Sequence, residues 1–312
     1  MSLLLPLRAD RRTYMLQFQV AQALSVKVVH PLSQLRKAGR QARVPILMYH
    51  SILDRMGERP PYFEIHTRPD VFAKHMKFLS ENHYRTVDLA NAATGIPRGG
   101  DGGRQVCITF DDGYRDFYTH ALPILEQYGF TATVFVITRL AGDERVRKGD
   151  QEFLTWREIR QIRSAGIRIG SHTVTHPELR GLTGGEIERE LRQSKQALED
   201  KLGEQIFSFS YPYAFPEWDV QFAGFLKSLL RAEGYRNGVT TILGTSGPQY
   251  DPFFLPRLPV NSFDDIRLFQ AKLEGAYDWL HVAQLLSKRI RHAVTRSPAR
   301  KYLSCRSTGI LK

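Results

Sequence analysis

The sequence predicts an α/β fold in which parallel strands, covered by helices, close into a barrel. Short apolar runs that suit buried strands alternate along the chain with segments whose apolar residues recur at helical spacing. This alternation is typical of parallel strands joined by helices. Polar residues gather where the predicted strands end, which is where barrel enzymes build their sites, so we favour a barrel over an open doubly wound sheet. Neither a GxGxxG motif nor a P-loop follows the first strand, which argues against nucleotide binding.

The first predicted elements follow this alternation. The run 44–49 (VPILMY) suits a buried strand, and the segment 69–82 places four apolar residues at helical spacing. The apolar run 106–110 (VCITF) predicts a second buried strand. A helix over 122–128 is expected to end before Gly129, because glycine readily takes the left-handed conformation of a C-cap.

The rest of the barrel repeats the cycle. Further strands are predicted at 132–137, 167–170, 207–211 and 238–241, and further helices at 156–165, 185–202 and 222–233. A glycine directly follows each of these three helices, as is common at helix C-termini.

Charge divides the 312 residues into a body and two basic ends. Residues 1–44 carry a net charge of +7 and residues 281–312 a net charge of +8, whereas the whole chain carries +12. The region between them is therefore slightly acidic, which argues against a nucleic-acid footprint. We expect a basic N-terminal extension over 1–43, a catalytic domain over 44–278, and a basic, partly helical tail over 279–312.

Cysteines and hydropathy exclude several protein classes. The two cysteines, Cys107 and Cys305, cannot form a disulfide framework or a four-cysteine zinc site. The apolar run 3–7 is too short for a secretory signal, and no stretch approaches the roughly 20 apolar residues of a membrane span. We therefore expect no cleaved signal peptide and a cytoplasmic or membrane-peripheral location. The basic tails suit an anionic membrane or an acidic polymer, although a packed terminal helix with a solvated basic face would also explain the pattern after Trp279.

Chemistry-bearing residues follow three predicted strands. The segment 109–113 (TFDDG) places two carboxylates after an apolar run, and 171–176 (SHTVTH) places two histidines four residues apart. If the histidines share one helical turn, they converge on a point and suit a divalent metal together with an aspartate from another strand. Such a set leaves coordination positions open, as in hydrolytic metal sites. The third segment, 209–214 (FSYPYA), is either an aromatic wall for a sugar ring or a rigid turn.

These three segments, in this order and spacing, resemble the NodB-type polysaccharide deacetylases of carbohydrate esterase family 4. The resemblance covers about residues 44–260 and implies a distorted (β/α)7-type barrel that removes acetyl groups from N-acetylated hexosamines. It implies that Asp111 is the general base for the attacking water. The metal ligands it implies are Asp112, His172 and His176, with zinc favoured and cobalt, nickel or manganese as alternatives. The substrate-binding loop it implies is Tyr211, Pro212 and Tyr213, with the Tyr213 N–H helping to hold the oxyanion.

Two family features are displaced in this chain. The family's Leu-x-His motif has no match near the end of the domain, but Met48-Tyr49-His50 has that shape at its start. This arrangement is similar to the circularly permuted branch typified by poly-N-acetylglucosamine deacetylases, and makes His50 the candidate general acid. The family's arginine before the aromatic loop is replaced by Ser210, and Arg257 is the candidate that takes over its influence on Asp111.

The sequence thus predicts a metal-dependent N-deacetylase of an N-acetylated cell-envelope or exopolysaccharide glycan. Hydrolysis of a non-sugar C–N bond and a non-catalytic carbohydrate-binding role are the alternatives. The histidines at 66, 75, 83 and 120 have no strand-end partners, and we expect them on the surface or on helix faces.

Overall fold

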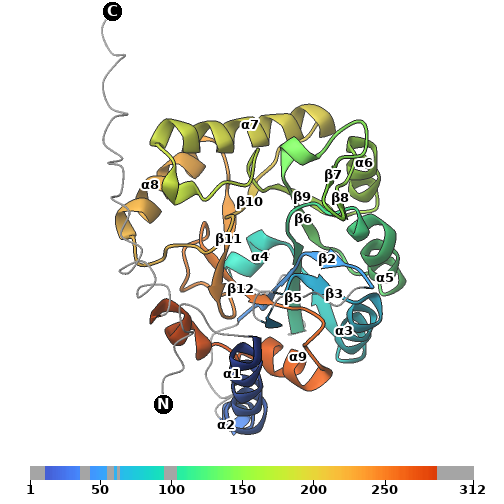
Figure 1. The fold of residues 1–312 in the computed structure, drawn as a ribbon, viewed down its shortest axis with the longest axis vertical. Coiled ribbons are helices and arrows are strands. Elements are labelled where there is room, and N and C mark those ends of the chain that lie inside the picture. Colours follow the sequence, from blue (N-terminus) through green and yellow to red (C-terminus); the bar gives the residue numbers. More distant parts are fainter. Residues whose placement is uncertain (1–10, 36–42, 55–59, 62–63, 95–103, 287–312) are drawn as a thin grey trace, which may run out of the picture.

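A computed structural model describes residues 11–35, 43–54, 60–61, 64–94 and 104–286 (Figure 1). Within these residues, seven parallel strands form a closed barrel: β1 (Ile46–Tyr49), β5 (Arg104–Phe110), β6 (Thr133–Val136), β9 (Arg168–Ser171), β10 (Ser208–Ser210), β11 (Asn237–Leu243) and β12 (Leu255–Pro259). Neighbours in the barrel follow chain order, and β12 pairs with β1 to close it. The predicted seven-stranded α/β barrel is confirmed.

Helices surround the ring of strands. They are α3 (Pro69–Glu81), α5 (Leu122–Gln127), α6 (Trp156–Ser164), α7 (Gly184–Leu202), α8 (Val220–Ala232) and α9 (Ile266–Leu273), with a π-helical turn η3 (Phe117–Ala121) before α5 and 3-10 turns η4 (Thr138–Leu140) and η5 (Leu179–Gly181). Thr155 and Thr183 cap α6 and α7 through reciprocal hydrogen bonds with glutamates three residues on. Gly203 ends α7 at φ +68°, the conformation that glycine adopts most readily. The predicted helix bounds therefore hold to within two residues.

Short strands extend the barrel at its edges. They are β2 (Ser51–Ile52), β3 (His66–Thr67), β4 (Tyr84–Thr86), β7 (Arg147–Lys148) and β8 (Gln151–Glu152). The pair β2–β3 is parallel, β7–β8 is an antiparallel hairpin, and β4 adds to the outside of β5. None of these strands was predicted, because each is too short for a pattern of period two.

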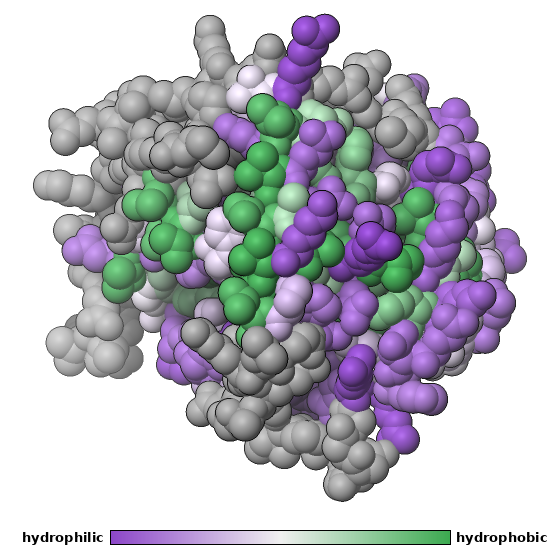
Figure 2. All heavy atoms as spheres, turned by 90° about the horizontal axis from the view of Figure 1, so that it is seen from below, coloured by the Kyte–Doolittle hydropathy of each residue, from purple (hydrophilic) through white to green (hydrophobic). Residues whose placement is uncertain are grey.

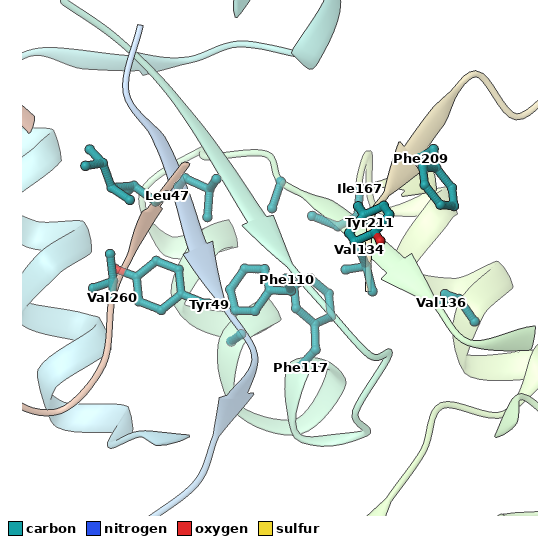
Figure 3. Close-up of a cluster of buried hydrophobic side chains, with 14 of the residues drawn as sticks. Leu47, Tyr49, Phe110, Phe117, Val134, Val136, Ile167, Phe209, Tyr211 and Val260 are labelled. Carbon is teal, nitrogen blue, oxygen red and sulfur yellow. The ribbon is translucent and has the colours of Figure 1, made fainter. Parts of the chain in front are cut away.

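The strands bury both of their faces. Tyr49 and Phe110 stack at 5.4 Å between ring centroids, and Phe117 meets Phe110 edge-on at 4.8 Å, between the barrel and its helices (Figure 3). Alternate residues such as Ile46 and Cys107 belong to a second cluster, which packs with α4 (Leu89–Thr94). This helix lies at the centre of the ring in Figure 1. The N-terminal end of the barrel is thus filled by apolar side chains, which leaves the other end for the site.

The described part of the predicted N-terminal extension contains a long helix docked on the barrel. It consists of α1 (Arg11–Leu24), a π-helical segment η1 (Ser25–Val29) and α2 (His30–Leu35). Phe18 is 5% exposed and meets the Phe263 ring, and the Ser25 hydroxyl accepts a hydrogen bond from Trp279 Nε1 at 3.1 Å. Helical backbone continues over 280–286, whereas the predicted tail beyond 286 lies outside the described residues. The proposed division at residues 43 and 278 stays a prediction.

Among the described residues, no helix combines the length and the hydropathy that crossing a bilayer would need.

His75 occupies the core between α3 and α9. It is fully buried, its ring stacks on Phe269 at 4.1 Å between centroids, and its Nε2 lies 2.8 Å from the carbonyl oxygen of Asp264. Since a carbonyl only accepts, Nε2 carries the proton and Nδ1 accepts from the Tyr49 hydroxyl at 3.1 Å. His75 is thus a neutral core histidine on a helix face, and no part of it is at the surface.

We expect this histidine to weaken the fold in mild acid. Burial lowers the pKa of His75 from 6.5 to about 4, against smaller raising effects of Asp264 and Asp265. Between these values the unfolded chain binds the extra proton, so stability falls as pH decreases from about 6.5 to 4 by roughly 3 kcal/mol. Urea unfolding of His75→Phe should give a lower but less pH-dependent stability over this range. The exposed control His120→Gln should keep the wild-type slope, and an unchanged slope in His75→Phe would contradict the assignment.

Candidate metal and catalytic site

Two adjacent carboxylates leave the C-terminal end of β5 in opposite directions. The backbone N–H of Asp111 donates to the Tyr49 carbonyl at 3.0 Å, which continues the pairing with β1. Asp112 and Gly113 then take left-handed conformations, with φ of +70° and +72°. Aspartate tolerates this region better than most residues, and glycine does so without cost. The turn therefore separates the two side chains, so that each faces different partners.

His172 and His176 meet Asp112 from a loop after β9. The spacing of this pair would suit one helical turn, but the segment is irregular, and Thr173 and His176 have φ of +67° and +60°. Local hydrogen bonds replace the helical ones, because Glu190 accepts from two backbone N–H groups of the loop at 2.8 and 3.0 Å. The Thr173 hydroxyl oxygen also accepts from the His176 N–H at 3.0 Å. The loop is thus held by side chains of its own and of α7.

The separations between these three side chains fit a small divalent ion. Asp112 Oδ1 lies 3.4 Å from Nε2 of His172 and 3.4 Å from Nε2 of His176. Ligands around a tetrahedral zinc ion with bonds of about 2.0–2.1 Å are about 3.3 Å apart, which matches these separations. Asp112, His172 and His176 also form the group of candidate ligands found among the described residues. The predicted set is therefore assembled, and its role as a metal site stays a prediction.

The environment of His172 prepares its Nε2 for a metal. Nδ1 donates to the Ser210 carbonyl at 2.8 Å, which fixes the ring and directs Nε2 at Asp112. Burial lowers the pKa of His172, but the hydrogen bond to Asp112 and the charges of both aspartates outweigh it, so the pKa lies above its ordinary value. Burial also raises the pKa of Asp112, and the neighbouring histidines reverse this to a lowered value. Asp112 and His172 therefore each favour the charged form of the other, whereas burial and the charge of His172 lower the pKa of His176 to about 4.

Asp111, which follows β5, is paired with Arg257 of β12. Strand β1 lies between these two strands in the barrel. Nη1 and Nη2 of Arg257 donate to the two Asp111 oxygens at 2.8 and 2.7 Å. Arg257 is fully buried, and its other protons go to the Thr109 hydroxyl, the Ser210 hydroxyl and the Thr240 carbonyl at 3.0–3.1 Å. A small residue at 210 leaves room for this guanidinium, and its hydroxyl donates to Asp111 Oδ1 at 3.2 Å.

This pairing keeps Asp111 ionised. Burial raises the pKa of the carboxyl group, but the charge and hydrogen bonds of Arg257, with smaller contributions from His172 and His50, hold the pKa at about 2. The structure therefore places Arg257 where the sequence hypothesis needs it. Its role as a positioning residue stays a prediction.

His50 follows β1 and faces the same space. Its Nε2 lies 4.0 Å from Asp111 Oδ2, and its side chain is 22% exposed. Burial lowers the pKa of His50 against the raising effects of Asp112 and Asp111. His50 thus lines the same cavity as Asp111 and the three metal candidates. The histidines nearest the end of the domain offer no such group: His281 pairs with Glu217 at 2.6 Å, and His292 lies outside the described residues.

The aromatic loop contributes in two ways. Tyr211 is 2% exposed and its ring packs edge-on against Phe215, and Pro212 is also buried. Tyr213 is 56% exposed at φ +58°, with its ring 4.5 Å from that of His176. Tyr213 is thus the member of the loop that presents a ring to solvent beside a metal candidate. The predicted binding roles of all three residues stay predictions.

A cavity of about 1130 Å³ opens above these groups. Its floor contains both aspartates and the three histidines His50, His172 and His176. Its walls come from across the chain: Gln17 of α1, Glu64 and Ile65, Arg139 and Leu140, Lys148, Gln151 and Phe153 of the β7–β8 region, Leu243, and Leu280, Ala283 and Gln284. Sequence reasoning missed most of this wall, since neither the hairpin nor the terminal helices carry a motif. The cavity is large enough for more than one sugar ring.

Comparison with known proteins gives consistent matches. The family model described as polysaccharide deacetylase matches residues 98–229, which include Asp111, Asp112, His172, His176 and the aromatic loop but neither His50 nor Arg257. YxkH of Bacillus subtilis strain 168, which is named as a polysaccharide deacetylase, is 33% identical over 240 residues, or 77% of this chain and 79% of YxkH. The poly-β-1,6-N-acetyl-D-glucosamine N-deacetylase of Escherichia coli K12 is 32% identical over 117 residues, or 34% of this chain and 17% of that protein.

A solved structure shares the fold. The deacetylase PplD of Streptococcus pyogenes, in complex with acetate, superposes with a TM-score of 0.64 at 24% identity. The match covers 75% of this chain and 99% of PplD. At this identity the likeness supports the barrel alone.

Proposed function

We propose, on the premise that this chain belongs to the polysaccharide deacetylase family, that it removes acetyl groups from N-acetylhexosamine units of an exopolysaccharide or cell-envelope glycan with the help of a divalent metal. Family membership confirms the predicted enzyme class, a hydrolase of the amide bonds in sugar acetyl groups. Zinc is the metal we favour, because one carboxylate and two imidazoles are its usual hydrolytic ligands. The relative that acts on poly-β-1,6-N-acetyl-D-glucosamine supports a glucosamine polymer as substrate.

One observation carries the proposal: adjacent carboxylates on one turn have separate partners. Asp112 faces His172 and His176, whereas Asp111 is held by Arg257. A metal ion bound by the first group would supply a Lewis acid for the acetyl carbonyl and for the attacking water. Asp111 is then left free to accept a proton from that water. Its low pKa means that it is ionised at neutral pH, as a base must be.

The remaining groups serve the two ends of the scissile amide. In this scheme the backbone N–H of Tyr213 helps to hold the oxyanion. The position of the Tyr213 ring, 4.5 Å from that of His176, supports this role. His50 donates the proton that the leaving amine needs, because an amine leaves far more readily than an amide anion. Arg257 touches no substrate in this scheme, and acts by orienting Asp111.

We expect His50→Ala to retain metal and to lower kcat by about 10²- to 10³-fold. The reason is that His50 lies 4.0 Å from Asp111 yet belongs to no ligand set. Metal content by mass spectrometry and acetate release at saturating substrate would measure both effects. His281→Ala is the matched control and should match wild type. A normal kcat in His50→Ala would show that another group supplies the proton.

Metal removal and return would test the proposed function. Chelated protein should release no acetate from N-acetylglucosamine oligomers, and activity should return with stoichiometric zinc or cobalt. Metal binding without acetate release would exclude these oligomers as substrates. Failure to bind either metal would refute the assignment of Asp112, His172 and His176.

A further inference from the structure

The N-terminal helix, formed by α1, η1 and α2, is apolar on both of its sides. Its inner side is buried against the barrel through Phe18, Ala21 and Ser25. Its outer side exposes Leu16 (62%), Leu24 (37%), Val28 (46%) and Leu32 (56%), which we call the outer apolar face. Residues 13–35 contain a single charged side chain, Lys27. The helix therefore presents leucines and a valine to solvent in addition to the apolar residues that it buries, although Gln19 and Lys27 are also exposed on it. Exposed apolar side chains that gather on one side of a helix mark an interaction surface.

The helix over 280–286 adds to the same region. Trp279 contacts Ser25, and Gln17 and Leu280 line one cavity, so the two ends of the described chain meet beside the mouth of the barrel. This second helix exposes Val282 (64%) and Leu286 (47%). Seen from below, hydrophobic side chains gather in a band over the helices at the bottom of Figure 1, with hydrophilic ones beside them (Figure 2).

The stretches of sequence that contain and flank these two helices carry basic residues and no acidic ones. Between Asp10 and Asp54 the sequence contains seven arginines and lysines and no acidic residue, and after Asp278 it contains eight and no acidic residue. The acidic side chains that border the N-terminal helix form hydrogen bonds or ion pairs with residues of the helix or of the chain just after it. Gln22 donates to Asp265 at 3.2 Å, His30 pairs with Glu274 at 3.1 Å, and Arg43 pairs with Asp278 at 3.0 Å.

We propose that the outer apolar face docks on an anionic lipid bilayer and holds the enzyme at its surface. Exposed leucines and valines would enter the boundary between headgroups and acyl chains, while flanking lysines and arginines attract anionic headgroups. The charge pattern favours a bilayer over a second copy of the chain, because two copies would bring like charges together. Since Gln17 and Leu280 line the cavity, docking would bring the active-site mouth to the membrane surface.

Vesicle sedimentation of the full chain tests this proposal. Wild type should sediment with vesicles of phosphatidylcholine and phosphatidylglycerol, and less with phosphatidylcholine alone or at about 1 M salt, where charges are screened within about 3 Å. The triple variant Leu24→Gln, Val28→Asn, Leu32→Gln keeps every charge and should reduce binding about tenfold. Val220→Asn, at a valine that is 78% exposed on α8, is the matched control and should bind like wild type.

Two results would overturn the proposal. One is equal binding by wild type and the triple variant. The other is a wild-type dimer in analytical ultracentrifugation that the triple variant converts to monomer, with no vesicle binding by either, which would make a second copy the occupant.

Acetate release from soluble oligomers, measured without vesicles, keeps this proposal separate from the deacetylase assignment. The three substituted residues lie outside the cavity, so the triple variant should match wild type in this assay. Vesicle binding without acetate release would leave docking intact and remove only the proposed substrate.

Discussion

Asp112→Ala is expected to abolish metal binding and reduce turnover to the level of metal-free protein, whereas Asp111→Asn should retain the metal and still lose turnover. The reason is the separation of partners at the end of β5. Asp112 Oδ1 is equidistant from both histidine nitrogens, at 3.4 Å, and its loss leaves only two ligands. Asp111 contacts no ligand candidate at hydrogen-bond distance, but is the group placed to accept a proton. An asparagine there cannot do so, and we expect a loss of about 10²- to 10⁴-fold in kcat.

Metal content and acetate release, measured on the same protein samples, check both outcomes. Circular dichroism must first show that each variant is folded, because Asp111→Asn leaves the buried guanidinium of Arg257 without a counter-charge. Asp143→Ala, at a carboxylate that is 78% exposed, is the matched control and should match wild type. Equal metal content and near-normal turnover in the two site variants would refute the division of roles.

The second large effect is expected at Arg257. Arg257→Met should destabilise the fold by roughly 3–5 kcal/mol, because it strands an ionised carboxylate in a buried site. The double variant Arg257→Met, Asp111→Asn removes both charges. Its loss of unfolding free energy should therefore be smaller than the sum of the losses in the two single variants. Urea unfolding of the four proteins gives this coupling. Additive effects would show that the two side chains do not depend on each other.

The pH profile separates positioning from simple stabilisation. In wild type the pKa of Asp111 is about 2, so kcat/KM should show no loss from its protonation down to about pH 4. Without the guanidinium, only the histidines and the Ser210 hydroxyl oppose the effect of burial, and the pKa of Asp111 rises. The acid limb of the Arg257→Met profile should therefore move to higher pH. Arg257→Lys keeps the charge but loses the two-pronged contact, and should shift the limb less.

The sequence identifies which residues form the site, but only part of the backbone conformation that holds them. Strand ends identify Asp111, Asp112, His172 and His176, because parallel strands deliver their C-termini to one rim. The spacing of the two histidines, by contrast, suits a helical turn as well as a loop. Whether a helical turn or a loop forms depends on Glu190, which binds the loop backbone. Glu190 lies 14 residues beyond His176, and no local sequence pattern marks it as a partner.

The elements that were missed share a physical cause. In the N-terminal helix the inner residue Phe18 and the outer residue Leu16 are both apolar, so no two-sided pattern marks the helix. His75 is a further example, since its partners Tyr49 and Asp264 lie 26 and 189 residues away in the chain. Arg257 could be nominated from its place at a late strand, but its bidentate contact depends on barrel closure.

Because β12 closes the barrel, the parts of the site become available in a fixed sequence while the ribosome synthesises the chain. A nascent chain that has emerged through β10 already carries Asp112, His172 and His176, the full set of metal candidates. The guanidinium that holds Asp111 is 146 residues beyond it and arrives only with β12. A chain that ends before β12 therefore lacks the residue that holds Asp111, and the proposed base is held in place only when the last strand has joined the first.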